Sequence, residues 1–274
     1  MTVRVHVAAQ ITSLDAAGNR ALAVAAVRGA ADDGASLVVL PEYAARFDPG
    51  GPDPDHAEPV DGPFVTALQD VARSTGVVVV AGTLLPGNRT DRAVNAVVVV
   101  GPDGLAGLYR KVHLYDAFGQ RESDHLEAGP ADVPPVVVSV GDLHVGVMTC
   151  YDLRFPESAR RLIDGGATVL AVPAAWAAGE HKADHWRTLL RARAIESTAY
   201  VLGAAQQGAG VVGDSLVIDP AGQVLAASGG PSPAVAELDP AQVVAIRERN
   251  PSLVNRRYGV VPLDGPVDTV WPHS

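Results

Sequence analysis

The sequence predicts an α/β protein that folds as a four-layer α-β-β-α sandwich built from two similar βαβα halves. Segment 34–41, GASLVVLP, closely resembles segment 166–173, GATVLAVP, and each contains an apolar run typical of a buried strand. The elements predicted around the two segments also follow the same order. Strands this apolar must be covered on both faces, which favours two sheets packed together with helices outside.

The predicted elements are taken in chain order from hydrophobic periodicity and from turn and capping signals. In the first half they are a strand at 3–10, an Ala-rich helix at about 15–32, a strand at 36–40, a helix opening at Gly62-Pro63, a strand at 76–81, and a hairpin of 95–100 with 105–109. In the second half they are a strand at 143–149, a helix at about 156–164, a strand at 166–173, a helix at about 181–197, a strand at 200–205, and a hairpin of 215–218 with 223–226.

The remaining segments are predicted to be loops and a tail. Segment 46–59 is rich in Pro, Gly and Asp and follows Glu42 directly, so we expect it to rim a site there, and segment 117–135 follows Lys111 in a similar way. A short helix is expected from Asp239-Pro240 to about residue 249. The extension at about 250–274 should lie along a surface or a partner subunit. No low-complexity linker interrupts the sequence, so we expect a single domain over 1–274.

Composition narrows the class of protein. The chain has 274 residues, of which 47% are hydrophobic and 19% charged. No apolar run approaches the roughly 20 residues of a membrane span, and the N-terminus lacks the order of a signal peptide. Together with a single cysteine, this predicts a cytoplasmic protein without a membrane partner. A formal net charge of −10 argues against a nucleic-acid partner.

The single cysteine, Cys150, is predicted to stand where a strand passes into a helix. The apolar run before it reads as a buried strand, and Pro156 followed by Glu157 is a helix-start signal. A side chain at such a corner projects over the end of a sheet, with backbone N–H groups beside it. A lone cysteine is often only a small buried hydrophobe, but this position suits a nucleophile.

Segment 150–157, CYDLRFPE, resembles the nucleophile segment of the nitrilase (carbon-nitrogen hydrolase) superfamily. Two further blocks of that superfamily occur in the right order, namely 37–42, LVVLPE, and 109–114, YRKVHL. The likeness continues through 185–196 and 213–222 to about residue 240. The resemblance implies the same four-layer architecture and a catalytic triad of Glu42, Lys111 and Cys150.

The resemblance also implies a role for each member of the triad. Cys150 would attack an amide carbonyl, and Glu42 would act as general base and later as proton donor. Lys111 would stabilise the oxyanion, with the backbone N–H of Tyr151 as a second donor. Each residue also has a structural alternative when it is considered alone. Glu42 could be a helix-capping or surface carboxylate, and Lys111 could end a strand with its side chain in water. The chain contains only two lysines, Lys111 and Lys182, so a lysine inside a motif suggests a specific role.

A second glutamate is expected to orient the lysine and the substrate. Segment 121–129, RESDHLEAG, resembles the family block that follows the lysine and indicates Glu122. It has Ala128-Gly129 where the family commonly has Pro-Gly, so Glu127 stays open as the alternative. A solvated loop carboxylate is the plainer interpretation of either residue.

Other polar and aromatic residues are weaker candidates. Tyr151, Arg154 and Trp176 are candidate substrate-binding residues, although Trp176 could equally be a core aromatic. Asp152 and Arg154 are expected to serve structure first, by pairing with each other or with neighbours. His181, Asp184 and His185 could share a helix face, but no further ligand block accompanies them, so we expect no metal and no cofactor.

These observations predict an enzyme that hydrolyses a small carboxamide to carboxylate and ammonia through a cysteine thioester. The motifs are most similar to the branch with ω-amidase and deaminated glutathione amidase, which implies a substrate carboxylate and makes Arg154 a candidate to bind it. The alternatives are an N-carbamoyl amino acid amidohydrolase, a nitrilase and, least favoured, a non-catalytic scaffold. A serine hydrolase is disfavoured because the Gly-x-Ser-x-Gly elbow is missing. By resemblance we also expect a homodimer or higher homo-oligomer that associates through helices including 181–197.

Overall fold

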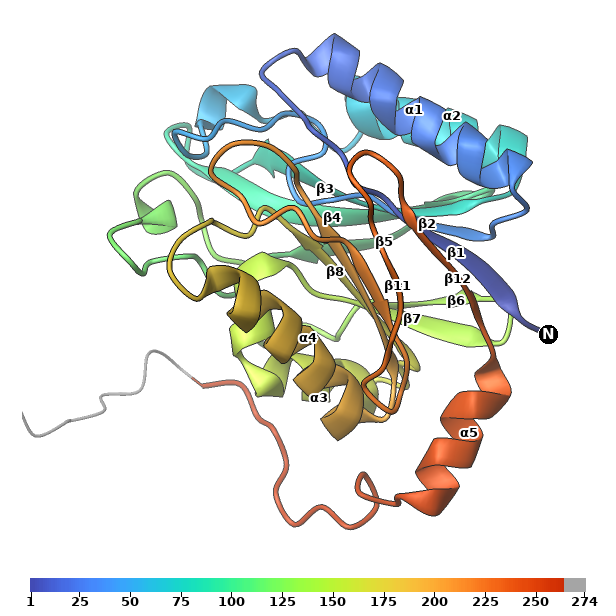
Figure 1. Ribbon diagram of the computed structural model, residues 1–274. Coiled ribbons are helices and arrows are strands. Elements are labelled where there is room, and N and C mark those ends of the chain that lie inside the picture. The colour runs from blue at the N-terminus through green and yellow to red at the C-terminus, as the bar shows by residue number, and fades with distance from the viewer. Residues whose placement is uncertain (264–274) are drawn as a thin grey trace, which may run out of the picture.

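The computed structural model describes residues 1–263 and contains two six-stranded sheets packed face to face with helices on the outside (Figure 1). The last part of the predicted extension, residues 264–274, lies outside the described residues. The first sheet has the order β12(Ala234–Leu238), β1(Val3–Val7), β2(Leu37–Val39), β3(Val78–Pro86), β4(Ala93–Gly101), β5(Gly104–Arg110). The second has the order β11(Val224–Ala227), β10(Leu216–Ile218), β9(Tyr200–Ala205), β8(Val169–Ala174), β7(Leu143–Val147), β6(Val137–Val140).

The two sheets repeat one topology. In each, three neighbouring strands are parallel, namely β1, β2 and β3 in the first sheet and β7, β8 and β9 in the second. An antiparallel hairpin continues each sheet on one side, and one antiparallel strand closes it on the other. The predicted sandwich of two similar halves is therefore confirmed.

Alternation along the strands explains why continuous apolar runs form this sandwich. Leu37 and Val39 face the core between the sheets, whereas Val38 and Leu40 face the helices α1(Ala16–Asp32) and α2(Pro63–Thr75). In the second sheet Val169 and Ala171 face the central core, and Leu170 and Val172 face α3(Pro156–Asp164) and α4(Lys182–Ser197). Each parallel strand is thus buried on both faces, as the sequence pattern requires.

Helix ends follow the sequence signals. Asp15 caps α1 by accepting hydrogen bonds from the backbone N–H groups of Ala17 and Gly18, each at 3.1 Å. Helix α2 begins at Pro63 and stops at Gly76, whose positive φ of 77° places it in the left-handed region. The predicted short helix is α5(Pro240–Arg249), capped by Asp239.

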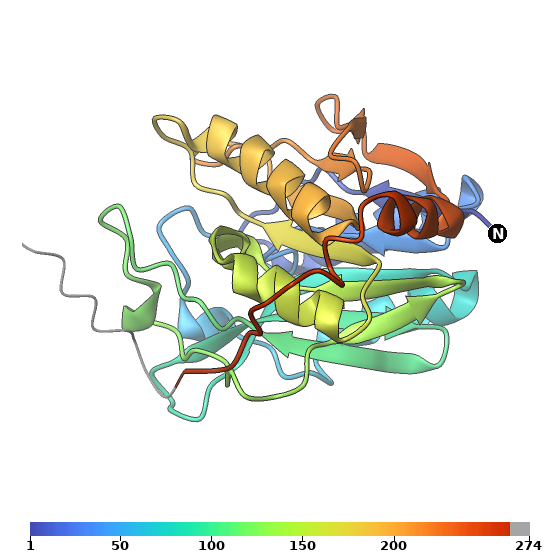
Figure 2. The same cartoon turned by 90° about the horizontal axis from the view of Figure 1, so that it is seen from below.

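Two strands were not predicted from the sequence, β6 and β12. Both are short edge strands with partly exposed residues. Strand β6 begins shortly after Pro134-Pro135, and β12 has a charged residue, Glu237, near its end, so neither pattern marked a buried strand. After α5, residues 250–263 run past α3 (Figure 2), where Arg256 pairs with Asp164. Val254, Tyr258 and Val261 of this stretch are exposed.

The ends of the parallel strands bring the predicted site residues to one edge of the sandwich. Glu42 follows β2, Lys111 follows β5, which runs parallel to β3, and Cys150 follows β7. The chain at Glu42 passes very close to Gly82 of β3, because a Cβ atom at Gly82 would lie only 2.4 Å from the Cα of Glu42. Only a glycine lets the two backbones approach this closely.

The substitution Gly82→Ala should therefore displace Glu42 and destabilise the protein by about 1 to 3 kcal/mol, the usual cost of overpacking. The matched control is Gly101→Ala in β4, where the added Cβ would meet only a side-chain carbon of Val78 at 3.9 Å. Thermal unfolding of both variants checks the expectation. Equal stability of Gly82→Ala and the control would show that the close approach at Gly82 does not hold Glu42.

Candidate active site

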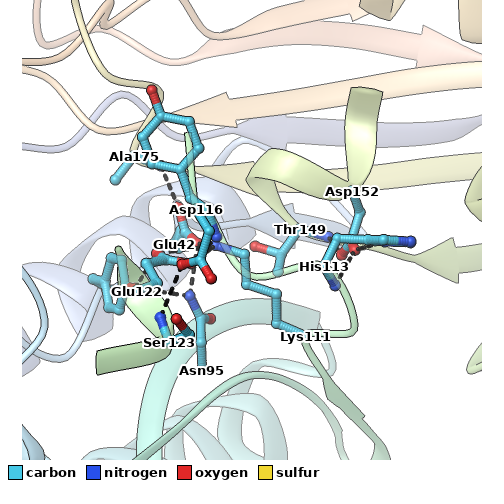
Figure 3. Close-up of polar contacts among 12 residues, drawn as sticks. Glu42, Asn95, Lys111, His113, Asp116, Glu122, Ser123, Thr149, Asp152 and Ala175 are labelled. Atoms are coloured by element: carbon cyan, nitrogen blue, oxygen red, sulfur yellow. Dashed lines mark hydrogen bonds and ion pairs between the residues drawn. The ribbon is translucent and has the colours of Figure 1, made fainter. Parts of the chain in front are cut away.

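The centre of the site is a buried lysine held between two carboxylates (Figure 3). Lys111 is fully buried, and its Nζ lies 3.0 Å from Oε1 of Glu42 and 2.8 Å from Oε2 of Glu122. Burial lowers the pKa of Lys111, but the charges of Glu122 and Glu42 raise it, and the net pKa lies well above its usual value. The ammonium is therefore permanently charged at neutral pH.

Glu42 is oriented by hydrogen bonds to both carboxylate oxygens. Besides Lys111, the side-chain amide of Asn95 donates to its Oε1 at 2.7 Å, and the backbone N–H of Ala175 donates to its Oε2 at 2.7 Å. Asn95 belongs to β4, whereas Ala175 directly follows β8 of the other sheet. Only 1% of Glu42 is exposed, so its carboxylate has one fixed position in a dry environment.

The structure separates the two candidate glutamates that the sequence left open. Glu122 accepts from Lys111, from the hydroxyl of Tyr43 at 3.0 Å and from the backbone N–H of Tyr115 at 2.8 Å. Glu127 instead accepts from the backbone N–H groups of Asn88 and Arg89 in a surface turn. The geometry therefore places Glu122, and not Glu127, beside Lys111.

Cys150 occupies a strained corner immediately after β7. Its φ is +47°, a left-handed conformation that non-glycine residues adopt at an energetic cost and that is frequent at functional sites. Cys150 also begins a short 3₁₀ helix, Cys150–Arg154, so the expected strand-to-helix corner is present one turn before α3. The corner directs the thiol into the same pocket as Glu42.

Asp152 ties this corner to the segment that follows Lys111. Its carboxylate is fully buried and accepts from the backbone N–H of Thr149 at 3.0 Å and from the hydroxyl of Tyr109 at 2.7 Å. It also accepts from the backbone N–H of His113 at 3.2 Å and lies 2.7 Å from Nδ1 of the His113 ring. Asp152 thus serves structure, as expected, but through these partners and not through Arg154.

The thiol of Cys150 is protonated at neutral pH in this environment. Burial raises its pKa well above the usual value, and the negative charge of Glu42 adds to the rise, against the opposing effect of Lys111. A thiol of this kind needs a base to remove its proton as it attacks. The carboxylate of Glu42 lies beside the thiol and lines the same pocket.

The thiol opens into a pocket of about 460 Å³, which suits a small molecule. Loop 46–53 and loop 119–125 form part of its rim, as the sequence predicted for the segments that follow Glu42 and Lys111. Tyr151, Arg154 and Trp176, the candidate substrate-binding residues, all line it. Trp176 also packs against Trp186, so it is both a core residue and a wall of the pocket.

Three contributors to the site were missed from the sequence. Asn95 and Tyr43 orient the two carboxylates, and Asn95 Nδ2 also donates to the Tyr43 hydroxyl at 2.9 Å. Lys182, the second lysine, lines the pocket and is buried. Of these three residues, only Asn95 could have been noticed from the sequence, because it is a lone amide in the apolar strand 93–101 and amides are uncommon inside buried strands.

Residues 1–263 contain no cluster of three or more His, Cys, Asp or Glu side chains arranged to hold a metal ion. His181 and His185 have ring centroids 6.4 Å apart, and His181 lies next to Glu180. In the same part of the chain, no helix is both long and apolar enough to cross a bilayer.

Comparisons with known proteins show which family the chain belongs to. The family model for carbon-nitrogen hydrolases matches residues 5–248. Over 84% of its length the chain is 38% identical to a deaminated glutathione amidase from Escherichia coli, 87% of which is covered. Among solved structures, the NitFhit protein of C. elegans matches with a TM-score of 0.84 and 30% identity, over 93% of this chain and 65% of the nematode chain.

An amidase from Nesterenkonia, solved as a double mutant in complex with acrylamide, matches with a TM-score of 0.76 and 26% identity over 94% of each chain. The family model covers most of the sequence, including all three motif blocks, and several of the curated relatives are named as amidases. The chain described here therefore belongs to the carbon-nitrogen hydrolase family, whose members are enzymes that act on carbon-nitrogen bonds.

Proposed function

We propose that the protein hydrolyses a small carboxamide to a carboxylate and ammonia, through a thioester on Cys150. The observation that carries the proposal is that Cys150 and Glu42 line one pocket and that the buried ammonium of Lys111 contacts Glu42 there. A nucleophile, a base and an oxyanion donor are the groups that amide hydrolysis requires. We therefore assign these three roles to Cys150, Glu42 and Lys111 in the proposed mechanism.

In the first step the sulfur of Cys150 attacks the amide carbonyl while Glu42 takes the thiol proton. The raised pKa of the thiol makes this base necessary, because little thiolate exists before the substrate binds. Glu42 is suited to the task, since its oxygens are held in place by Asn95 and by the backbone N–H of Ala175.

Lys111 would stabilise the negative charge that develops on the carbonyl oxygen. An ammonium has three donors. One is directed at Glu42 and another is shared by the two oxygens of Glu122, which leaves a third for the oxyanion. The backbone N–H of Tyr151, near the start of the 3₁₀ helix, is the proposed second donor. Glu122 acts by holding Lys111 in place.

Collapse of the tetrahedral intermediate then breaks the carbon-nitrogen bond. Glu42 returns the proton to the leaving nitrogen, so that ammonia departs and the acyl group remains on sulfur. A water molecule next loses a proton to Glu42 and attacks the thioester. The second collapse breaks the carbon-sulfur bond, and Glu42 returns its proton to the sulfur of Cys150. The carboxylic acid that is released ionises in water to the carboxylate.

An amide is favoured over a nitrile or a carbamoyl compound by the names of the relatives. The Escherichia coli relative is a deaminated glutathione amidase, and the Nesterenkonia structure is an amidase with acrylamide. All three substrate classes use the same sulfur and the same base, so the residues alone do not rank them.

The main experiment measures ammonia release from a panel of small amides, carbamoyl amino acids and nitriles, with hydroxylamine added to trap the thioester. We expect a hydroxamate from the productive amides, slower nitrile turnover, and loss of turnover in Cys150→Ala without unfolding, because that change removes only the acyl acceptor. Nitrile hydrolysis without amidase activity, or full activity of Cys150→Ala, would refute the mechanism.

A matched pair of variants tests the role of Glu122. Glu122→Gln should lower kcat by about 100-fold or more, because the lost charge loosens Lys111 at the oxyanion. Glu127→Gln lies in the same loop but contacts only the turn at Asn88 and Arg89, so it should keep near-normal kcat. Steady-state kinetics on the best amide provides the check, and equal effects of the two changes would contradict the assignment.

We also propose that the protein self-associates as a homodimer through a surface that includes α4 and the 250–263 stretch. Exposed apolar side chains on these segments support the proposal, among them Ile195, Val254 and Tyr258. Light scattering at micromolar concentration should give about twice the chain mass of 28.2 kDa. A monomeric mass would exclude this association.

A further inference from the structure

Gln206 is a fully buried polar residue that the proposed mechanism does not use. It directly follows β9, the strand next to β8 in the second sheet. Its backbone N–H donates to the carbonyl of Ala174 at 2.8 Å and so continues the pairing of β9 with β8. Its side chain, in contrast, reaches segments that follow strands of the first sheet. A buried amide is stable only when it is hydrogen-bonded, so the partners of Gln206 indicate its role.

Both the donor and the acceptor of the Gln206 amide are engaged. Nε2 donates to the backbone carbonyl of Glu42 at 2.9 Å and to the hydroxyl of Thr12, and Oε1 accepts from the backbone N–H of Thr12 at 3.3 Å. These partners fix the direction of the amide, because a carbonyl can only accept and a backbone N–H can only donate. Thr12 follows β1 and Glu42 follows β2, so the contact joins strand ends from both sheets.

Thr12 extends this contact to the next residue of the chain. Its hydroxyl donates to the backbone carbonyl of Tyr43 at 3.3 Å, so Gln206 and Thr12 together hold the carbonyls of two consecutive residues. Tyr43 has a φ of +57°, a left-handed conformation that a bulky residue keeps only where surrounding contacts impose it. The two hydrogen bonds to the carbonyls of Glu42 and Tyr43 are contacts of this kind.

The peptide held in this way carries two side chains of the site. Glu42 extends from it to Lys111, and Tyr43 extends from it to Glu122, each over a hydrogen bond of 3.0 Å. Rotation of this peptide would therefore displace both carboxylates beside Lys111. A displacement of a reacting group by about 1 Å can lower the rate about 100-fold, even when its cause lies far from the chemistry.

Gln206 and Thr12 have no access to the substrate. In the part of the chain that the structure describes, neither residue lines the pocket into which Cys150 opens. Both lie behind Glu42 and are buried, so an effect on the reaction has to pass through the backbone of Glu42 and Tyr43. Such an effect changes kcat more than KM, because the substrate contacts stay in place.

We infer that Gln206 is a positioning residue for the general base, and that together with Thr12 it holds the Glu42–Tyr43 peptide so that both carboxylates beside Lys111 keep their positions. The inference rests on the proposed function, in which Glu42 moves the protons. It gives a side chain of the second sheet a direct part in placing the backbone of a base that belongs to the first.

The test replaces Gln206 by an apolar residue of similar length. Gln206→Met removes the side-chain hydrogen bonds and should lower kcat about 10- to 100-fold, with a KM within about twofold of the wild type. The matched control is Gln207→Met. Gln207 also donates to two backbone carbonyls, but these belong to Gly213 and Gly230 and not to Glu42, so kcat should stay near normal. Steady-state kinetics use the amide, carbamoyl compound or nitrile that the wild type hydrolyses fastest.

Thr12 provides a second and milder pair of variants, which gives the answer if Gln206→Met does not fold. Thr12→Val keeps the shape of the side chain and removes the hydroxyl, so it should lower kcat about 3- to 10-fold, the range expected for one hydrogen bond. Thr12→Ser keeps the hydroxyl and should restore wild-type kcat.

A structural role alone predicts a different result, namely a lower Tm with unchanged kcat in the folded Gln206→Met and Thr12→Val variants. That result would overturn the inference, as would a higher KM at unchanged kcat. Failure of the proposed amidase function is distinguishable from both outcomes, because it appears in the wild type, as hydrolysis of a nitrile or a carbamoyl compound in place of an amide. The variants are then compared on that compound.

Discussion

The buried ammonium of Lys111 is the interaction on which the rest of the site depends. A lysine that is completely removed from water is unstable by several kcal/mol unless anions surround it, and here Glu42 and Glu122 do so. The two carboxylates in turn repel each other and need donors of their own. Asn95, Tyr43 and the backbone N–H groups of Tyr115 and Ala175 meet that need and fix both carboxylates in place. Burial, together with the charge of Glu42, raises the pKa of the Cys150 thiol, so the same buried arrangement sets the electrostatic environment of both Glu42 and Cys150.

The duplicated fold explains how residues so far apart in the sequence reach this arrangement. Strands β2 and β8 occupy equivalent positions in their sheets, and the segments that follow them meet where the backbone N–H of Ala175 donates to Glu42. Gln206, which follows β9, donates to the backbone carbonyl of Glu42 at 2.9 Å. Glu42 and Lys111 come from the first half and Cys150 from the second. The site therefore exists only where the two sheets are packed together, and neither half contains it alone.

Local patterns were enough to predict the sandwich and the central strands, because apolar runs and prolines are short-range signals. Glu42, Lys111 and Cys150 were singled out by the resemblance of their segments to a known family. The edge strands β6 and β12 were missed because they are short and partly exposed, which gives a weaker pattern than that of the buried strands. The sequence also did not show which distant side chains contact each other. Asp152 is 43 residues from Tyr109, and Glu42 is 133 residues from Ala175, so only the folded chain shows which of them meet. The choice between Glu122 and Glu127 needed the same information, because both are carboxylates in one loop and differ only in what they contact.

The two lysines of this chain illustrate how environment assigns different chemistry to the same side chain. Lys111 lies between two carboxylates, which neutralise it and make it a fixed electrostatic support. Lys182 lies beside Arg154 and aromatic rings, where its charge is left without a protein counter-ion in the described residues. One region of the pocket is consequently acidic and another basic, within a protein whose formal net charge is −10. Such a polarised pocket orients a polar ligand, because Glu42 and Glu122 repel negative charge and Arg154 and Lys182 attract it.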